Sequence, residues 1–138
     1  MSGERRWLAA YECEQAIIGF FNCLDDRKFD QMASKFSVDG RWIRATGAVL
    51  EGRAAVLQAM NERPASVQSR HLVSNFEFEF VDDQTARSRC CVTVYRIDGK
   101  VGDSDPAPMV YAFNNEFKLR DGAWKIELHH GRRAFAAE

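Results

Sequence analysis

Two ionisable side chains stand where the surrounding sequence is apolar. Asp25 lies four residues after Phe21 and eight after Ile17, so on a continuous helix its carboxylate extends a buried stripe. His71 belongs to the stretch SRHLVSN, which leads into the apolar run FEFEF. Burial raises the pKa of a carboxyl group, and a nearby protonated imidazole lowers it again. If paired, these two groups would tune one another and could transfer protons.

Both residues also have structural explanations. An aspartate before a helical run accepts hydrogen bonds from the free N–H groups of the first turn. For Asp25, capping of the next helix and a role in a site both stay open, whereas for Asp26 capping is our preferred interpretation. His71 is interpreted as a pocket residue, and either catalysis or a satisfied hydrogen bond in the core would explain it.

Strand alternation makes the direction of His71 a separate question. Along a regular strand His71 points to the face opposite Phe76, Phe78 and Phe80. Either the strand is kinked near Ser74–Asn75, or the phenylalanines face a partner subunit. We expect the kink, with His71 directed inward.

Periodicity predicts helices first and strands second. Apolar spacing indicates a long helix over residues 5–24, a short helix over 27–35 and a third helix at 53–63, which Pro64 ends. A short hairpin is expected within residues 39–52. Turn sequences DDQ, GKVGDSDPAP and RDG then separate four strands, predicted at 70–81, 86–97, 109–119 and 124–135. This order predicts one α+β domain, residues 1–138, in which helices cover one face of an antiparallel sheet.

Composition excludes several classes of protein. The chain has 138 residues, 46% of them hydrophobic, and a formal net charge of -1 with no basic run beyond a pair, so neither nucleic acid nor a membrane is an expected partner. No signal peptide or membrane-spanning run is recognisable, and we expect a cytoplasmic protein. The cysteines at positions 13, 23, 90 and 91 form no CxxC pair, so we expect small apolar fillers and no metal site.

The order of these parts resembles a known family. FNCLDDRKFDQMASKFSVDGRW, EGRAAVLQAM, SRHLVSN and DGAWKI follow one another as in the SnoaL-like branch of the nuclear-transport-factor-2-like superfamily, from about Tyr11 to Arg133. The resemblance implies a cone-shaped fold, in which a strongly bent antiparallel sheet wraps on three N-terminal helices and encloses an apolar pocket. Members include scytalone dehydratase, bile-acid dehydratases, ketosteroid isomerase, polyketide cyclases and the non-catalytic small subunits of ring-hydroxylating dioxygenases.

The resemblance also implies a mechanism. Asp25 and His71 match the aspartate and histidine that face each other in the family's dehydratases. His71 would remove a proton next to a carbonyl group, while Asp25 fixes its tautomer and stabilises the imidazolium. The expected activity is that of a lyase or isomerase acting on a small hydrophobic, cyclic molecule, and this chemistry needs no metal and no organic cofactor.

Departures from the dehydratase pattern narrow the expectation. Where the family has tyrosines, this chain has Phe20 and Leu24 on the first helix and Arg44 at the short strand, and the second histidine is replaced around Tyr95-Arg96. Dehydration of scytalone itself is therefore not expected. The alternative is a non-catalytic ligand-binding or assembly subunit. A homodimer or higher homo-oligomer, formed through the outer sheet face, fits both readings.

A further set of side chains is expected to bind substrate. In the last strand, Trp124, Ile126, Leu128 and His130 share one face by alternation, which would put His130 at the end of a buried surface. A bulge would exchange this set with the one that contains His129. The expected substrate-binding residues are Phe21, Trp42, Arg44, Tyr95, Tyr111 and His130.

Overall fold

A computed structural model describes residues 1–99 and 106–135 of the chain. Its helices are α1 (Gly3–Asp25), α2 (Phe29–Ala33) and α3 (Arg53–Asn61). Its strands are β1 (Phe36–Ile43), β2 (Val49–Glu51), β3 (Val67–Asp82), β4 (Thr85–Asp98), β5 (Met109–Arg120) and β6 (Ala123–Arg133). The predicted α+β order is confirmed, and most of the expected β4–β5 connection lies outside the described residues.

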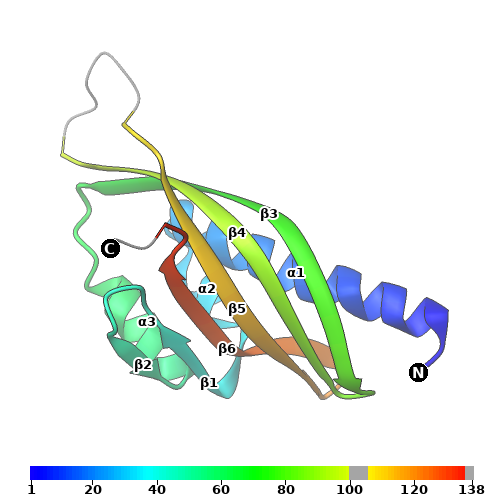
Figure 1. The fold of residues 1–138 in the computed structure, drawn as a ribbon. Coiled ribbons are helices and arrows are strands. Elements are labelled where there is room, and N and C mark those ends of the chain that lie inside the picture. Colours follow the sequence, from blue (N-terminus) through cyan, green and yellow to red (C-terminus); the bar gives the residue numbers. More distant parts are fainter. Residues whose placement is uncertain (100–105, 136–138) are drawn as a thin grey trace.

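The strands form one curved, open sheet in the order β2-β1-β6-β5-β4-β3. All neighbouring pairs are antiparallel except β1 and β6, which run parallel and join the first hairpin to the C-terminal meander. Figure 1 shows the long helix α1 lying along the sheet, with α3 beside the short strands. Packing of α1 against β3 and β6 brings the end of the helix to the start of β3.

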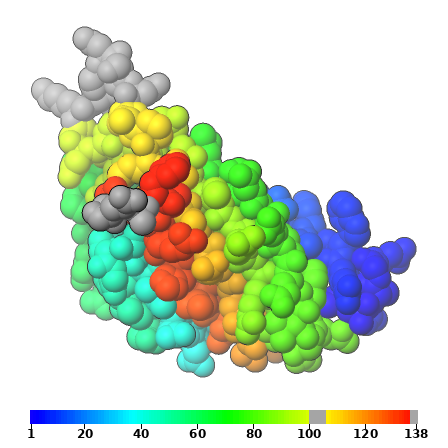
Figure 2. Space-filling model, in the orientation of Figure 1, coloured from blue at the N-terminus to red at the C-terminus, as the bar shows by residue number. Residues whose placement is uncertain are grey.

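Helix α1 forms because one of its faces is apolar and its first turn is capped. The Ser2 side chain accepts a hydrogen bond from the Arg5 backbone N–H at 3.2 Å, as expected of an N-cap serine. The buried residues recur every three or four positions: Ala9, Cys13, Ala16, Ile17, Phe20, Phe21 and Leu24. The first turns protrude from the body of the protein, where Trp7 and Tyr11 are exposed (Figure 2).

Helix α1 ends just before Arg27, whose backbone adopts a left-handed conformation with φ of 59°. Its guanidinium donates to the carbonyl groups of Arg63, Pro64 and Val67, which ties this turn to the α3–β3 connection. Helix α2 starts later than predicted, after Lys28, and no side chain caps it. The predicted capping role of Asp26 is therefore wrong: its carboxylate lies 3.5 Å from the Arg70 guanidinium.

Strand β3 contains the kink that the sequence analysis predicted. Its register against β4 shifts between Ser74 and Glu77, and Asn75 has a φ of 60°. The extra residue of this β-bulge lets side chains on both sides of it face inward. His71 lies opposite the buried Val94, and Phe76, Phe78 and Phe80 pack against the core. The conflict between the histidine and the phenylalanines is thereby removed.

A second irregularity lies between β5 and β6 and reverses one expectation. The register shifts between Glu116, which lies opposite Leu128, and Phe117, which lies opposite Ile126. The residue of β6 between these two therefore has no partner on β5. Beyond this point the two side-chain sets of β6 are exchanged. His129 is completely buried and His130 is exposed, so the predicted position of His130 on the buried face is wrong.

The core lies between α1 and the concave face of the sheet. Phe20 is at its centre and makes edge-on contacts with the rings of Phe21, Phe36, Trp42 and His129. Cys90 is buried and its neighbour Cys91 is half-buried, as expected for adjacent residues on opposite strand faces. Among residues 1–99 and 106–135, no helix is long and apolar enough to cross a membrane.

Candidate functional site

Asp25 and His71 meet where the last residue of α1 reaches the inward face of β3. His71 Nδ1 lies 2.7 Å from Asp25 Oδ1, and the His71 backbone N–H donates to Oδ2 at 2.7 Å. The Ser69 hydroxyl donates to Oδ1, also at 2.7 Å. One guanidinium N–H of Arg63 donates in turn to Ser69 Oγ at 2.8 Å. The aspartate is thus held on both oxygens and leaves no rotational freedom for the imidazole.

These contacts keep the Asp25 carboxylate ionised. Its side chain is only 4% exposed, and burial by itself raises its pKa. The hydrogen bond from the His71 ring, the charge of that ring, the Ser69 hydroxyl and the His71 backbone N–H outweigh burial and hold the pKa below its ordinary value of 3.8. Asp25 is therefore a hydrogen-bond acceptor on both oxygens at neutral pH.

An ionised acceptor fixes the tautomer of neutral His71. Because Asp25 Oδ1 can only accept, the proton of the imidazole is on Nδ1, and Nε2 keeps its lone pair. The ring stacks on Phe21 with a centroid distance of 4.5 Å and an interplanar angle of 22°. Its side chain remains 14% exposed. His71 has the arrangement of a general base: a fixed ring with one free, accessible nitrogen.

His71 lines a cavity of about 170 Å³ between α1, the end of β1 and the strands β3 to β5. Asp25 lies behind His71 and lines the neighbouring hollow beside Arg70. The volume of the cavity at His71 is below the roughly 300–1,000 Å³ typical of sites for drug-sized ligands, so a small molecule fits best. Most of the wall is apolar: Phe21, Leu24, Trp42, Val92, Val94, Met109 and Phe113. The polar groups are those of Arg44, Thr46, Arg63, Ser69, His71, Arg96 and Tyr111.

Four of the six residues that the sequence analysis expected to bind substrate lie at the wall of this cavity. Phe21, Trp42, Arg44 and Tyr111 line the cavity. Within the described structure the Tyr111 hydroxyl finds only the Met109 sulfur, at 3.7 Å, so its donor remains available to a ligand.

The other two, Tyr95 and His130, do not line the cavity. Tyr95 was expected there but alternates with the inward-facing Val94 and Arg96 and borders a separate hollow beside Arg70. His130 lies opposite the exposed Asn114 on the outer face. In both cases the side chain lies on the other face of its strand. Tyr95 was assigned to the pocket because tyrosines often line pockets, and His130 because the bulge in β6 was not predicted.

Three polar residues of this region were not predicted. Ser69 is two positions before His71, so alternation on β3 could have placed both on one face. Arg96 is two positions after Val94 in the same way. Arg63 had no such signal, because its contact with Ser69 depends on the path of the chain between α3 and β3.

His129 is a second histidine next to the site. Its ring stacks on Phe113 at 4.2 Å, and its Nδ1 lies 2.7 Å from Asn115 Oδ1. The amide N–H groups of Asn115 donate to Ser88 and Cys90, so the oxygen accepts from His129 Nδ1–H. Burial, with a smaller contribution from His71, lowers the pKa of His129 to about 3. The ring is neutral, and its Nε2 has no hydrogen-bond partner among the described residues.

Comparison with known proteins identifies the family. A family model described as a SnoaL-like domain matches residues 5–130. The chain belongs to the SnoaL-like family. A comparison with curated protein sequences finds no match.

Several solved structures share the fold of this SnoaL-like domain. A candidate scytalone dehydratase from Novosphingobium aromaticivorans matches with a TM-score of 0.86 and 18% identity over 97% of this chain and 89% of its own. Hexachlorocyclohexane dehydrochlorinase LinA-type3 from Novosphingobium barchaimii matches with a TM-score of 0.82 and 20% identity, over 97% of this chain and 92% of its own. An NTF2-like protein with a cystatin-like fold from Novosphingobium aromaticivorans matches with a TM-score of 0.82 and 19% identity, over 96% of this chain and 86% of its own. At these identities the likeness establishes the fold.

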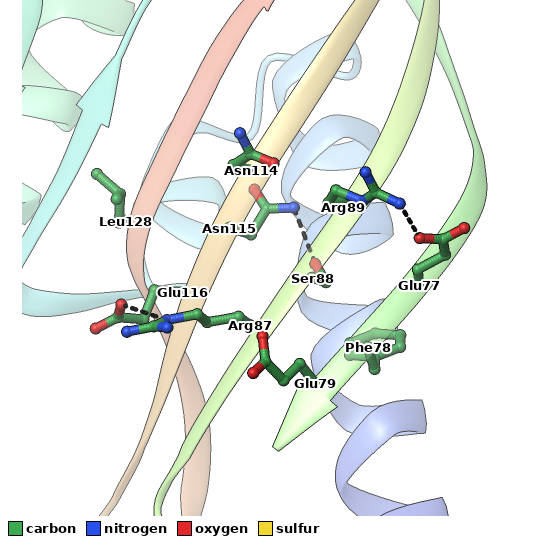
Figure 3. Close-up of a pocket in the computed structure, with 10 residues that line it drawn as sticks. All are labelled: Glu77, Phe78, Glu79, Arg87, Ser88, Arg89, Asn114, Asn115, Glu116 and Leu128. Atoms are coloured by element: carbon green, nitrogen blue, oxygen red, sulfur yellow. Dashed lines mark hydrogen bonds and ion pairs between the residues drawn. The ribbon is translucent and has the colours of Figure 1, made fainter. Parts of the chain in front are cut away.

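A larger hollow of about 420 Å³ lies on the outer sheet face of the SnoaL-like domain. Figure 3 shows its charged side chains projecting from β3, β4 and β5, with ion pairs between Arg89 and Glu77 and between Arg87 and Glu116. These pairs are largely exposed, and no imidazole or cysteine borders the hollow. The smaller inner cavity is the candidate site because it is lined by His71, whose ring is hydrogen-bonded to the buried Asp25.

Within residues 1–99 and 106–135, no three side chains of His, Cys, Asp or Glu are grouped so that they could hold a metal ion.

Proposed function

We propose that the protein is a cofactor-independent lyase or isomerase that removes a proton next to the carbonyl group of a small hydrophobic, cyclic substrate. The observation that carries the proposal is the Asp25–His71 hydrogen bond of 2.7 Å at the wall of an apolar cavity. A buried, oriented acid–imidazole pair beside a pocket is an arrangement typical of proton-transfer sites.

In the proposed reaction His71 Nε2 takes the proton from the carbon next to the carbonyl group. The electron pair of the broken C–H bond moves into an enolate, and Asp25 stabilises the imidazolium that forms on His71. The Tyr111 hydroxyl, whose one partner among the described residues is a thioether, can donate to the enolate oxygen. Ser69 and Arg63 position Asp25 and take no part in the proton transfer.

The enolate can react in two ways, and in each all atoms and charges are accounted for. In a lyase, its electron pair expels a hydroxyl group from the next carbon, and the imidazolium proton leaves with it as water. In an isomerase, the same proton returns at another carbon, and nothing leaves. Neither outcome calls on a redox change.

Two structural relatives support the elimination branch. One is a candidate scytalone dehydratase and another a hexachlorocyclohexane dehydrochlorinase, and both names describe removal of a proton and a leaving group from one substrate. For this chain such an activity remains our proposal, because likeness of fold does not transfer function.

The alternative, a non-catalytic binding or assembly subunit, predicts a pocket filled with side chains. The hollow beside His71 and the direction of Asp25, which binds His71 instead of capping α2, favour the enzyme. Homodimer formation through the outer sheet face stays a prediction.

Turnover of a panel of cyclic hydroxyketones, followed by the absorbance of the enone product, tests the proposal. His71→Ala should reduce the rate by about 10²- to 10⁴-fold, the usual contribution of a general base. His130→Ala is the matched control, since it removes an exposed imidazole and should leave turnover unchanged. Equal turnover by His71→Ala and wild type would exclude His71 from the reaction.

A further inference from the structure

The cavity wall carries more positive charge than its acid–imidazole pair requires. Arg44, Arg63 and Arg96 come from three separate places in the chain, the end of β1, the residues after α3, and β4, and all three line the same cavity. Among the described residues none of the three forms a salt bridge, and the charge of Asp25 acts on Arg63 through the intervening Ser69 region and not as a direct ion pair.

The three guanidinium groups also act on one another. Burial lowers the pKa of Arg44 and of Arg63, and the charge of Arg96 lowers both further. Like charges gathered at one wall are unfavourable in the empty protein, and an anion between them would relieve the repulsion. A purely structural role would instead provide each arginine with an acceptor.

The donor capacity of these arginines is largely unused. In the part of the chain that the structure describes, the side chains of Arg44 and Arg96 donate no hydrogen bond to protein, and Arg63 uses only its bond to Ser69. Arg44 is held in place by Trp42, whose ring centroid is 5.0 Å from the guanidinium carbon. A guanidinium held by stacking keeps its N–H fork free for an oxyanion.

We propose that the substrate of this site is an apolar ring that carries one oxyanion, a carboxylate or a phosphate, bound by Arg44 and Arg96 while the ring lies against Phe21 and Phe113. This inference rests on the proposed function for the reaction at His71, and adds the class of substrate. It also explains why arginines stand where the dehydratase pattern has other residues: the pocket selects for charge at one end.

Direct binding tests the inference without turnover. Isothermal titration calorimetry at low salt would compare cyclohexanecarboxylate, its methyl ester and cyclohexyl phosphate. One of the anions should bind at least about tenfold more tightly than the ester, equivalent to about 1.4 kcal/mol. Arg44→Gln and Arg96→Gln should each remove about that factor, whereas Arg6→Gln on the exposed start of α1 should not.

The two anions distinguish carboxylate from phosphate, since the tighter one identifies the group. An ester that binds as tightly as both anions would overturn the inference, and so would undiminished anion binding by Arg96→Gln or no binding at all. If the anion preference is found but His71→Ala turns over the hydroxyketones like wild type, the oxyanion site stands and the proposed function fails.

Discussion

Replacement of Asp25 by asparagine should reverse the tautomer of His71. The asparagine oxygen can still accept from the His71 backbone N–H, which cannot change its role as a donor. In the wild type, His71 Nδ1 lies 2.7 Å from Asp25 Oδ1. In the variant the amide N–H takes the place of Oδ1, so Nδ1 must accept a hydrogen bond from it. The imidazole proton moves to Nε2, so the nitrogen that faces the cavity is no longer a base.

The size of the effect follows from the contacts that change. Turnover should fall by about 10²- to 10⁴-fold, as for loss of the base itself. Hydrogen bonds to charged groups contribute about 1.5–3 kcal/mol each, so the loss of one such acceptor should lower the free energy of unfolding by about 2 kcal/mol at pH 7.

The same substitution has a defined pH dependence. The pKa of Asp25 is lower in the folded protein than its ordinary 3.8, so the unfolded state binds the proton more readily. The stabilisation is therefore complete above about pH 3.8 and is lost as pH falls through the lower pKa of the folded state. The difference in stability between wild type and Asp25→Asn should shrink in that window.

Nitrogen-15 NMR of the imidazole reads the tautomer, and urea unfolding gives the stability. We expect Nδ1–H in the wild type and Nε2–H in Asp25→Asn. If Asp25→Asn kept the Nδ1–H tautomer with full turnover, the assignment of Asp25 as the residue that orients His71 would be refuted.

Two further predictions concern the histidine and the bulge beside the site. The pKa of His129 is about 3 in the folded protein and 6.5 in the unfolded chain, so the unfolded state binds the proton more readily. The free energy of unfolding should therefore decrease as pH falls below 6.5, by up to about 1.4 kcal/mol per pH unit. Urea unfolding of His129→Phe should lack this part of the slope, and parallel pH profiles for the two proteins would contradict the neutral, buried state. Asn75→Val should lower the free energy of unfolding by about 1–2 kcal/mol relative to Asn75→Gly, because φ of 60° suits glycine and opposes a β-branched side chain. Equal stability of the two variants would show that the bulge is not held at this residue.

The sequence predicts the elements well because their signals are local. The stripe from Ala9 to Leu24 has helical spacing along its whole length, and the turn sequences mark the strand ends. The kink at Asn75 was predictable for a different reason: His71 and the phenylalanines could share a face only if one extra residue lay between them.

The second bulge left a weaker signal. In β6 the residues around His129 show no break in composition, and the exchange of faces comes from pairing with β5. Gly131 is the one local indication. A Cβ there would lie 2.6 Å from the Phe113 ring, so glycine is needed where the strand approaches that ring.

The grouping of the arginines at one cavity could not be predicted from the sequence. Arg44 was expected at the site, but Arg63 and Arg96 lie far from it along the chain and were not predicted. Only the fold brings the end of β1, the α3–β3 connection and β4 together around one cavity.

Exchange of substrate hydrogen with solvent deuterium tests the central claim most directly, because it detects proton removal even where no product forms. A cyclic keto acid in D₂O with wild-type protein should lose its proton NMR signal next to the carbonyl group faster than in buffer. His130→Ala should behave like wild type, and His71→Ala should exchange no faster than buffer. Equal acceleration by His71→Ala and wild type would contradict the assignment of His71 as the base.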